Sequence, residues 1–310
     1  MHQIALIGVA GAVLTAASNA VAQTPTVPPP APQNPSPMVE KSRAHGRIPQ
    51  QEPAGGRRTF AGPLDRPVQL FHSSGADRVA RSLCLVVHFH GAAFIPEIAA
   101  SRLGREYVVA TVNLGAGSGV YDRTFSDAGA YDLLLSSIRR ETAASLGRDV
   151  AFRRVTLAGF SAGHGAIRAI LREQRHFDAI DAVLLLDGLH TSYVPEGIVM
   201  EKGGTLDTTK LEAFVRYGRA AMRGEKRFLV THSEIFPGTF ASTTETSDYL
   251  VEALGLRRTP VLRWGPHGMQ QLSEVRNGRL EIMGFAGNSG PDHIDQFHGM
   301  PDFLRRIERK

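Results

Sequence analysis

The chain has 310 residues, of which 42% are hydrophobic and 21% are charged, so it can bury one large core of the ordinary soluble type. Its formal net charge is +5, but lysine and arginine are scattered and form no dense run beside aromatic residues, which argues against a nucleic-acid partner. Cys84 is the one cysteine and lies in an apolar run. We therefore expect Cys84 to be a small core residue that forms no intramolecular disulfide and takes no part in redox chemistry.

The first 22 residues have features of an export signal. Residues 4–17 form an apolar run too short to cross a bilayer and still anchor, and Ala20-Val21-Ala22 offers the small residues of a signal-peptidase site. The segment before the run has no Lys or Arg, which departs from the usual pattern, and an uncleaved interfacial anchor is the alternative. We expect residues 1–22 to be a cleaved signal peptide and the mature protein to be periplasmic or secreted, without stable membrane insertion.

Residues 23–57 are crowded with proline, glutamine and glycine and show no apolar period that could support a core, so a disordered tether is expected. Residues 58–310 are expected to form one folded domain. Apolar runs predict strands at residues 68–71, 83–89, 107–114, 155–158, 182–186 and 227–232. Helical spacing predicts helices at residues 97–103, 128–146, 162–171, 208–222 and 247–254 and at the end of the chain.

Two further expected strands, at residues 269–275 and 279–285, flank Asn277-Gly278 as a hairpin. Apolar strands that alternate with amphipathic helices predict an α/β fold, with a mostly parallel sheet and helices on both faces. In such a fold the ligand crevice lies beyond the carboxyl ends of the strands. The segment 188–226, between two expected strands, is expected to shape the substrate pocket.

Residues 154–171, RVTLAGFSAGHGAIRAIL, place a serine between an expected strand and an expected helix. Gly159-Phe160-Ser161-Ala162-Gly163 matches G-x-S-x-G, the pattern of a sharp strand-to-helix elbow whose serine hydroxyl is exposed above the sheet. Unpaired N–H groups and the helix dipole favour negative charge at the helix start. A chance match is the alternative in a chain with 32 glycines, but strand and helix lie where the pattern needs them. Ser161 is therefore the candidate nucleophile.

The order of the expected strands and helices, with the serine at a strand-to-helix elbow, resembles the α/β-hydrolase family of serine esterases and lipases over about residues 60–310. A second similarity is His88-Phe89-His90-Gly91-Ala92, which resembles the family's oxyanion loop at the end of a strand. The resemblance implies that the backbone N–H groups of Ala92 and Ala162 form the oxyanion hole and that no cofactor is needed. One such donor can lower the barrier by about 3–4 kcal/mol.

His88 and His90 also permit a different interpretation, because two histidines at this spacing on a strand point the same way and can share a metal ion. No acidic residue or further histidine follows nearby to complete a ligand shell, and the expected strand is otherwise apolar. We therefore expect no metal, and a histidine that is hydrogen-bonded within the oxyanion loop.

The resemblance implies a histidine base that follows Ser161 in the chain and precedes the final helix. His293 and His298 both lie in PDHIDQFHGMPDFLRRI, after the last expected strand. We prefer His293, because many family members have a stretch ending in proline and an acidic residue between the histidine and the final helix, and Pro301 lies eight residues after His293 but only three after His298. Asp292 can also cap the turn that begins at His293. His298 is the alternative.

Two carboxylates are candidates for the acid. Asp187 follows the expected strand at residues 182–186, in LLLDGLH, where some lipase-like relatives have their acid. The commoner position in the family follows the next strand, where Glu234 lies. We prefer Asp187, because a carboxylate that ends an apolar strand is costly without a partner. A structural carboxylate that binds loop N–H groups is a further interpretation of Asp187.

These residues together predict covalent acyl transfer, in which neutral His293 takes the proton of Ser161 and Asp187 holds the imidazole in the required tautomer. The plainest expectation is an exported carboxylic ester hydrolase that acts on a small-molecule or polymer ester. A peptidase or an acyltransferase uses the same residue types. An exported binding protein that keeps the fold without the activity is the alternative from a different class.

Overall fold

The structure is a computed structural model that describes residues 47–62, 64–78 and 82–309. The expected signal peptide, residues 1–22, and residues 23–46 of the expected tether lie outside these residues. Within the described part, Ile48 is buried, and strand β1 begins at Gly55 and pairs along its length with the next strand. The folded domain therefore begins before the expected boundary at residue 57.

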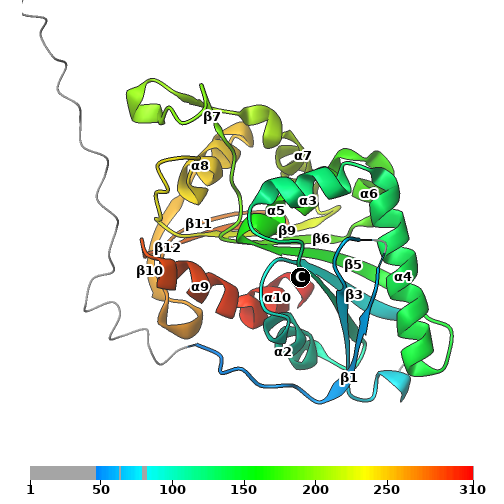
Figure 1. Cartoon of the computed structure of the whole chain (residues 1–310). Helices are drawn as coiled ribbons and strands as arrows, with labels where there is room; N and C mark the ends of the chain where they lie inside the picture. The colour runs from blue at the N-terminus through cyan, green and yellow to red at the C-terminus, as the bar shows by residue number, and fades with distance from the viewer. Residues whose placement is uncertain (1–46, 63, 79–81, 310) are drawn as a thin grey trace, which may run out of the picture. The chain divides into compact units, whose positions relative to one another are not determined.

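A mixed sheet of ten strands forms the centre of the described domain (Figure 1). The strands are β1 (Gly55–Phe60), β2 (Val68–Ser73), β3 (Ser82–Phe89), β4 (Tyr107–Val112), β5 (Ala151–Phe160), β6 (Ala182–Leu186), β9 (Arg227–His232), β10 (Thr259–Trp264), β11 (Gln270–Asn277) and β12 (Leu280–Phe285). Their order is β1-β2-β4-β3-β5-β6-β9-β12-β11-β10. The six strands from β4 to β12 in this order pair in parallel, and the two strands at each edge pair antiparallel. The predicted α/β fold with a mostly parallel sheet is confirmed.

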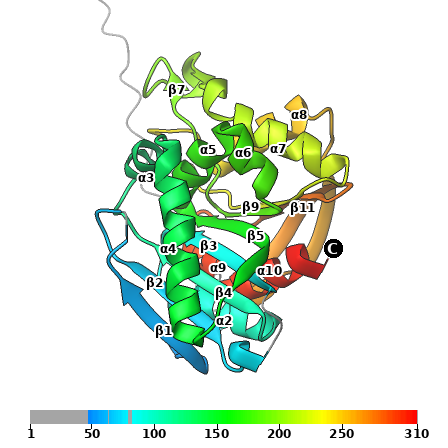
Figure 2. The ribbon, with the colours of Figure 1, turned by 90° about the vertical axis from the view of Figure 1, so that its right-hand side faces the viewer.

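Helices cover both faces of this sheet (Figure 2). They are α2 (Phe94–Leu103), α3 (Ser118–Phe125), α4 (Ala128–Leu146), α5 (His164–Arg172), α6 (Gln174–Ala179), α7 (Glu212–Met222), α8 (Thr243–Ala253), α9 (Gly290–His298) and α10 (Met300–Arg309). Short 3-10 turns are η1 (Ala76–Arg78), η2 (Ser161–Gly163), η3 (Met200–Lys202), η4 (Thr208–Lys210) and η5 (Pro266–Gly268). A separate two-stranded ribbon, β7 (Tyr193–Val194) with β8 (Thr205–Leu206), lies in the segment 188–226, which we call the insertion.

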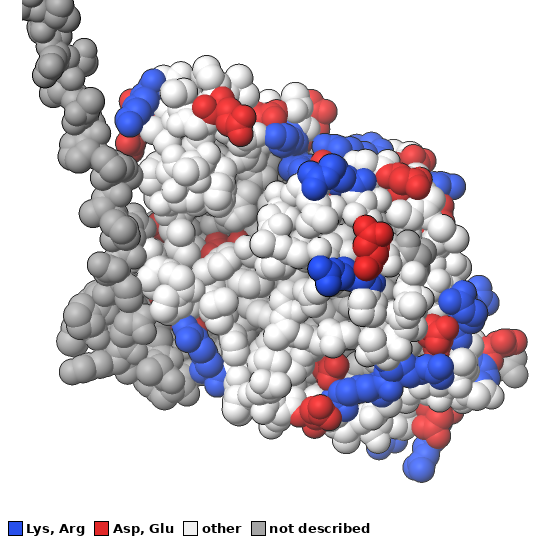
Figure 3. Space-filling view, in the orientation of Figure 1, with Lys and Arg blue, Asp and Glu red and all other residues white. Residues whose placement is uncertain are grey.

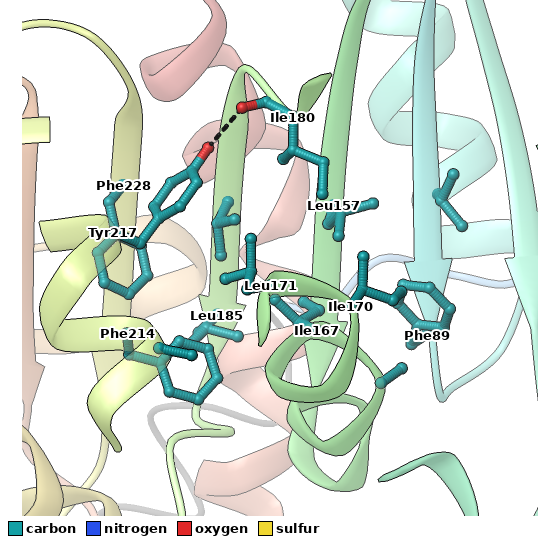
Figure 4. Packing of buried hydrophobic residues seen from close by; sticks show 14 of the residues in the cluster. Phe89, Leu157, Ile167, Ile170, Leu171, Ile180, Leu185, Phe214, Tyr217 and Phe228 are labelled. Carbon is teal, nitrogen blue, oxygen red and sulfur yellow. Dashed lines mark hydrogen bonds between the residues drawn. The ribbon is translucent and has the colours of Figure 1, made fainter. Parts of the chain in front are cut away.

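The sheet separates two hydrophobic cores, because alternate residues of a strand point to opposite faces. On β3, Leu85 and Val87 belong to the core with α3, α4, α5, α7 and α8, whereas Cys84 and Val86 belong to the core with α2, α9 and α10. Figure 4 shows the first core, where side chains of α5 and α7 pack on β5 and β6, and the hydroxyl of Tyr217 donates a hydrogen bond to the carbonyl oxygen of Ile180 over 3.1 Å. Cys84 is a buried core residue, as predicted.

Some elements differ from the expectation. Helix α8 begins at Thr243 rather than at residue 247, because Ser242 and Glu245 form a reciprocal capping box at its start. The predicted hairpin exists as β11 and β12, but β12 also pairs in parallel with β9, so the hairpin extends the main sheet. Helix α3 and strand β10 were not predicted.

Acidic and basic side chains are interspersed on the face seen in Figure 3, with no large patch of one sign. This distribution agrees with the scattered charge along the sequence and offers no extended basic surface on that face. Among the described residues, no helix combines the length and the apolar character that crossing a membrane requires.

Candidate active site

Ser161 lies at the sharp turn between β5 and α5. The strand ends at Phe160, the 3-10 turn η2 begins at Ser161, and Ser161 has a φ of +48°, which is uncommon for a residue other than glycine. The turn needs glycine at position 163, because a Cβ there would lie 2.1 Å from the backbone oxygen of Phe89. The predicted strand, turn and helix are therefore present around Ser161.

Asp187 directly follows β6, at the same end of the parallel strands as Ser161, and its φ is +43°. The next residue, Gly188, passes directly over the serine, because a Cβ at position 188 would lie 2.8 Å from the backbone oxygen and 2.9 Å from the backbone nitrogen of Ser161. The close approach of these two backbones brings the loop that carries Asp187 against the elbow.

The carboxylate of Asp187 is buried and accepts four hydrogen bonds. Ser233 donates its backbone N–H over 2.9 Å and its hydroxyl over 2.7 Å, and Thr243 donates its hydroxyl over 2.6 Å. The fourth contact joins Asp187 Oδ2 to His293 Nδ1 over 2.7 Å. Burial by itself would raise the pKa of Asp187, but the hydrogen bonds from His293, Thr243 and Ser233 stabilise the charged form and hold the pKa below its usual range.

His293 lies in α9, whose start is fixed by a capping box between Ser289 and Asp292. The backbone N–H and the hydroxyl of Ser289 donate to Asp292 Oδ2 over 2.9 and 2.8 Å. The imidazole of His293 lies 4.5 Å, between ring centroids, from the ring of Phe160, the residue before Ser161. His293 therefore contacts both the carboxylate of Asp187 and the residue next to the serine.

The alternative base, His298, and the alternative acid, Glu234, have other hydrogen-bond partners. The Nδ1 atom of His298 accepts a hydrogen bond from the backbone N–H of Ile48 over 3.0 Å, and burial lowers the pKa of His298. Glu234 is exposed, and its Oε2 atom accepts a hydrogen bond from the backbone N–H of Gly287 over 3.2 Å. The structure thus joins Asp187 to His293, places the ring of His293 beside Phe160, the residue before Ser161, and gives Glu234 and His298 other partners.

Ala92 and Ala162 both lie at helix starts, Ala92 just before α2 and Ala162 within η2. The first N–H groups of a helical segment have no intrahelical partner, so they are free to bind an anion. The side-chain amide of Asn113, just after β4, clamps the loop before Ala92. It accepts a hydrogen bond from the backbone N–H of Gly91 and donates one to the backbone oxygen of Gly91, each over 2.9 Å.

The two histidines of this loop have separate partners. His88 Nε2 lies 2.8 Å from the backbone oxygen of His90, the ring of His88 stacks on Phe297, and burial lowers the pKa of His88 to about 3. His90 Nδ1 lies 3.0 Å from the hydroxyl oxygen of Tyr121. Within the described part of the chain, no group of three or more His, Cys, Asp or Glu side chains is placed to hold a metal ion.

A cavity of about 680 Å³ opens beside Ser161. Its walls come from the glycine-rich loop before α3, from α5, and from the insertion, which Figure 1 shows on the same side of the sheet as α3 and α5. The lining residues are His90, Ala116, Gly117, Ser118, Gly119, Asp122, Ser161, Ala162, His164, Arg168, His190, Thr191, Ser192, Lys210 and Phe240. The volume is that of a site for a drug-sized molecule.

Sequence reasoning missed four residues that support this site. Asn113 clamps the loop before Ala92, and Ser233 and Thr243 bind the carboxylate of Asp187. His164, the first residue of α5, places Nδ1 2.9 Å from the backbone oxygen of Ser161. The capping sequence from Ser242 to Glu245 is a local signal that could have drawn attention to Thr243.

No family model matches the sequence, and no curated protein matches it either. The enterobactin esterase of Shigella flexneri, solved with enterobactin, has a similar structure with a TM-score of 0.52 and 11% identity, covering 84% of this chain and 60% of that one. Esterase 2 of Thermogutta terrifontis has a TM-score of 0.46 and 16% identity, covering 83% of this chain and 95% of that one. The acylaminoacyl peptidase of Pyrococcus horikoshii has a TM-score of 0.45 and 13% identity, covering 83% of this chain and 41% of that one.

The strand order and the likeness to the Shigella structure define the fold. This chain has the α/β-hydrolase fold.

Proposed function

We propose that this protein is an exported serine hydrolase that cleaves carboxylic esters, with Ser161 as nucleophile, His293 as base and Asp187 as acid. The observation that carries the proposal is the 2.7 Å hydrogen bond between His293 Nδ1 and Asp187 Oδ2. It joins residues 106 positions apart in the chain, and the imidazole that it orients lies against Phe160, next to the serine.

In the proposed reaction, Ser161 Oγ attacks the carbonyl carbon of the ester while His293 Nε2 takes the hydroxyl proton. Asp187 holds the proton on His293 Nδ1 and stabilises the imidazolium. The N–H groups of Ala92 and Ala162 stabilise the negative oxygen of the tetrahedral intermediate. His293 then gives its proton to the departing alcohol oxygen. Water attacks the acyl-enzyme with His293 again as base, which releases the acid and restores Ser161.

An ester is favoured over an amide as the substrate, because an amide nitrogen is the poorer leaving group and depends more strongly on receiving the proton of His293 as it departs. The proposed groups account for each step of the ester reaction, so the proposal needs no metal-bound hydroxide.

The test is covalent labelling with a phosphonate that reacts with activated serines, followed by peptide mapping, alongside turnover of 4-nitrophenyl esters of increasing chain length and of peptide anilides. We expect the label on Ser161 and ester turnover that survives a chelator. Turnover of the anilides but not of the esters would assign a peptidase. Loss of all activity on chelation, or absence of any label, would reject the proposed mechanism.

Export is the second part of the proposal, and its basis is the apolar run at residues 4–17 followed by Ala20-Val21-Ala22. The intact mass of the secreted protein tests it. Cleavage after Ala22 is expected, whereas a product that retains Met1 would indicate an anchor or no export.

Asn113→Ala is expected to lower kcat about tenfold to a hundredfold, because the loop that carries the Ala92 donor would lose both hydrogen bonds that fix Gly91. KM should change little, since the oxyanion forms only in the transition state. Asn113→Asp keeps the acceptor for the Gly91 N–H, so its kcat should lie between those of the wild-type protein and Asn113→Ala. A rise in KM at unchanged kcat would contradict this role.

A further inference from the structure

Lys210 brings a cation to the wall of the cavity that contains Ser161. It ends the 3-10 turn η4 in the insertion, and its side chain is 37% exposed. The ammonium group lies 3.1 Å from Asp207 Oδ2 and donates a hydrogen bond to the hydroxyl of Ser192. An ammonium has three N–H donors. Among the described residues these are its two partners, so one donor is left for a ligand.

Besides Lys210, the charged residues that line the cavity are Arg168 and Asp122. Asp122, on α3, is shared by two guanidinium groups, those of Arg168 at 3.1 Å and Arg172 at 3.5 Å. The lining residues alone thus comprise two cations and one carboxylate, and their ion-pair partners Arg172 and Asp207 add one charge of each sign. The hydrogen bond from Thr209, followed by the contact with Lys210, keeps the pKa of Asp207 below its usual range although partial burial opposes it. The charged side chains that line the cavity therefore carry a net charge of +1.

Three imidazoles also line the cavity, and they add polar groups without adding charge. Burial lowers the pKa values of His90, His164 and His190, so the rings are neutral at pH 7. Phe240 supplies an apolar surface beside His190, with 5.1 Å between the ring centroids. The wall of the cavity therefore combines neutral rings and an apolar surface with the ammonium group of Lys210.

We propose that the preferred substrate is an ester that carries a carboxylate away from the scissile bond, and that Lys210 binds this carboxylate. The inference rests on the proposed function, and it assigns the substrate class of the same site. The ammonium would form a charge-assisted hydrogen bond with the carboxylate in a partly enclosed cavity, where such a bond is stronger than on an open surface.

Two matched pairs of esters test this. In the first pair the difference is on the acyl side: mono-4-nitrophenyl adipate carries a carboxylate there, and the 4-nitrophenyl ester of adipamic acid carries an amide. The pair 4-acetoxybenzoate and 4-acetoxybenzamide differs in the same way on the alcohol side. The measured quantity is the ratio of kcat/KM for the anionic ester to that for the neutral one. Comparing this ratio between variants cancels the intrinsic reactivity of each ester.

Lys210→Gln is expected to lower this ratio about tenfold in at least one of the two pairs, the typical effect of losing a hydrogen bond to a charged group. High salt should reduce the wild-type ratio. Lys202→Gln is the matched control, because Lys202 is an exposed lysine of the same insertion that does not line the cavity. It removes the same charge and should change the ratio less than about twofold.

Asp207→Asn gives a prediction of opposite sign. It frees Lys210 from its carboxylate partner and should raise the ratio. If both Asp207→Asn and Lys210→Gln lowered the ratio, or if neither pair of esters responded to Lys210→Gln, the inference would be overturned while turnover of the neutral esters still supported the hydrolase. If the wild-type protein cleaved none of the four esters and took up no phosphonate, the proposed function would fail and this inference with it.

Discussion

Ser161→Ala is expected to lower kcat for ester hydrolysis about 10⁵-fold to 10⁶-fold, the loss typical of removing a catalytic serine. Ser161 is the only residue of the η2 turn with a hydroxyl group, and its backbone lies against Gly188. The stability should change by less than about 0.5 kcal/mol, because Ser161 is only partly buried and alanine meets the same positive φ without a new clash. Turnover and thermal unfolding of the purified variant check both statements.

A matched control for this change is Ser118→Ala, which removes a hydroxyl from the same cavity at the start of α3. It should lose far less activity than Ser161→Ala, because Ser118 has no place in the proposed proton transfer. Comparable losses in the two variants would show that the cavity tolerates no serine deletion, and wild-type turnover in Ser161→Ala would place the nucleophile elsewhere.

The elements around Ser161 could be predicted because their signals are local. Strand β6 is an unbroken apolar run, and the long helix α4 has the predicted bounds, since both have the hydrophobic spacing that burial demands. The steric limit at Gly159 is local, because a Cβ there would lie 3.1 Å from the carbonyl carbon of Gly163, whereas the limit at Gly163 comes from the backbone oxygen of Phe89 on β3. Patterns of this kind are present in the sequence without knowledge of the tertiary structure.

Other elements have no such signal. Strand β10 is mostly exposed at the edge of the sheet, with Leu262 76% and Trp264 73% exposed, so no apolar alternation distinguishes it from a loop. Helix α3 has only eight residues and buries only Tyr121 and Phe125. Helix α3 depends on packing against α5, which is distant in the sequence, and β10 is defined by its pairing with β11, the next strand in the chain.

The supporting contacts of the candidate site could not be predicted for the same reason. The two donors to Asp187 other than His293 lie 46 and 56 residues after it in the chain, and Asn113 lies 22 residues after Gly91. Sequence alone therefore offered Asp187 and Glu234 as acids, and His293 and His298 as bases. Asp187 and His293 form their hydrogen bond only because α9 and α8 pack at the carboxyl ends of the parallel strands.

Asp187→Asn is expected to lower kcat about 10⁴-fold, because an amide cannot accept the hydrogen bond of His293 in the same way or stabilise the imidazolium. His293→Ala should lower kcat about 10⁵-fold to 10⁶-fold, since Ser161 would lose its base. Asp187→Asn should also cost about 2–4 kcal/mol of folding stability, because donors from Ser233 and Thr243 would face an amide where a carboxylate was buried.

The stability loss of Asp187→Asn should depend on pH. The folded-state pKa of Asp187 lies below its ordinary value of about 3.9, so the ionised carboxylate contributes its stability above that pH and loses it as the pH falls through the lower folded-state value. The difference in unfolding free energy between the wild-type protein and Asp187→Asn should therefore be full at neutral pH and shrink in strong acid.

The controls are Glu234→Gln and His298→Ala, which change the alternative acid and base. Glu234 is exposed and should tolerate the change with less than about a twofold effect on kcat, as surface substitutions usually do. His298→Ala removes the acceptor of the Ile48 N–H, so its effect should fall on stability more than on kcat. A loss of kcat in either control that exceeds the loss in Asp187→Asn or His293→Ala, at equal stability, would transfer the role of acid or base to that residue. The proposed role of Ser161 would remain, because it does not depend on which acid and base complete the site.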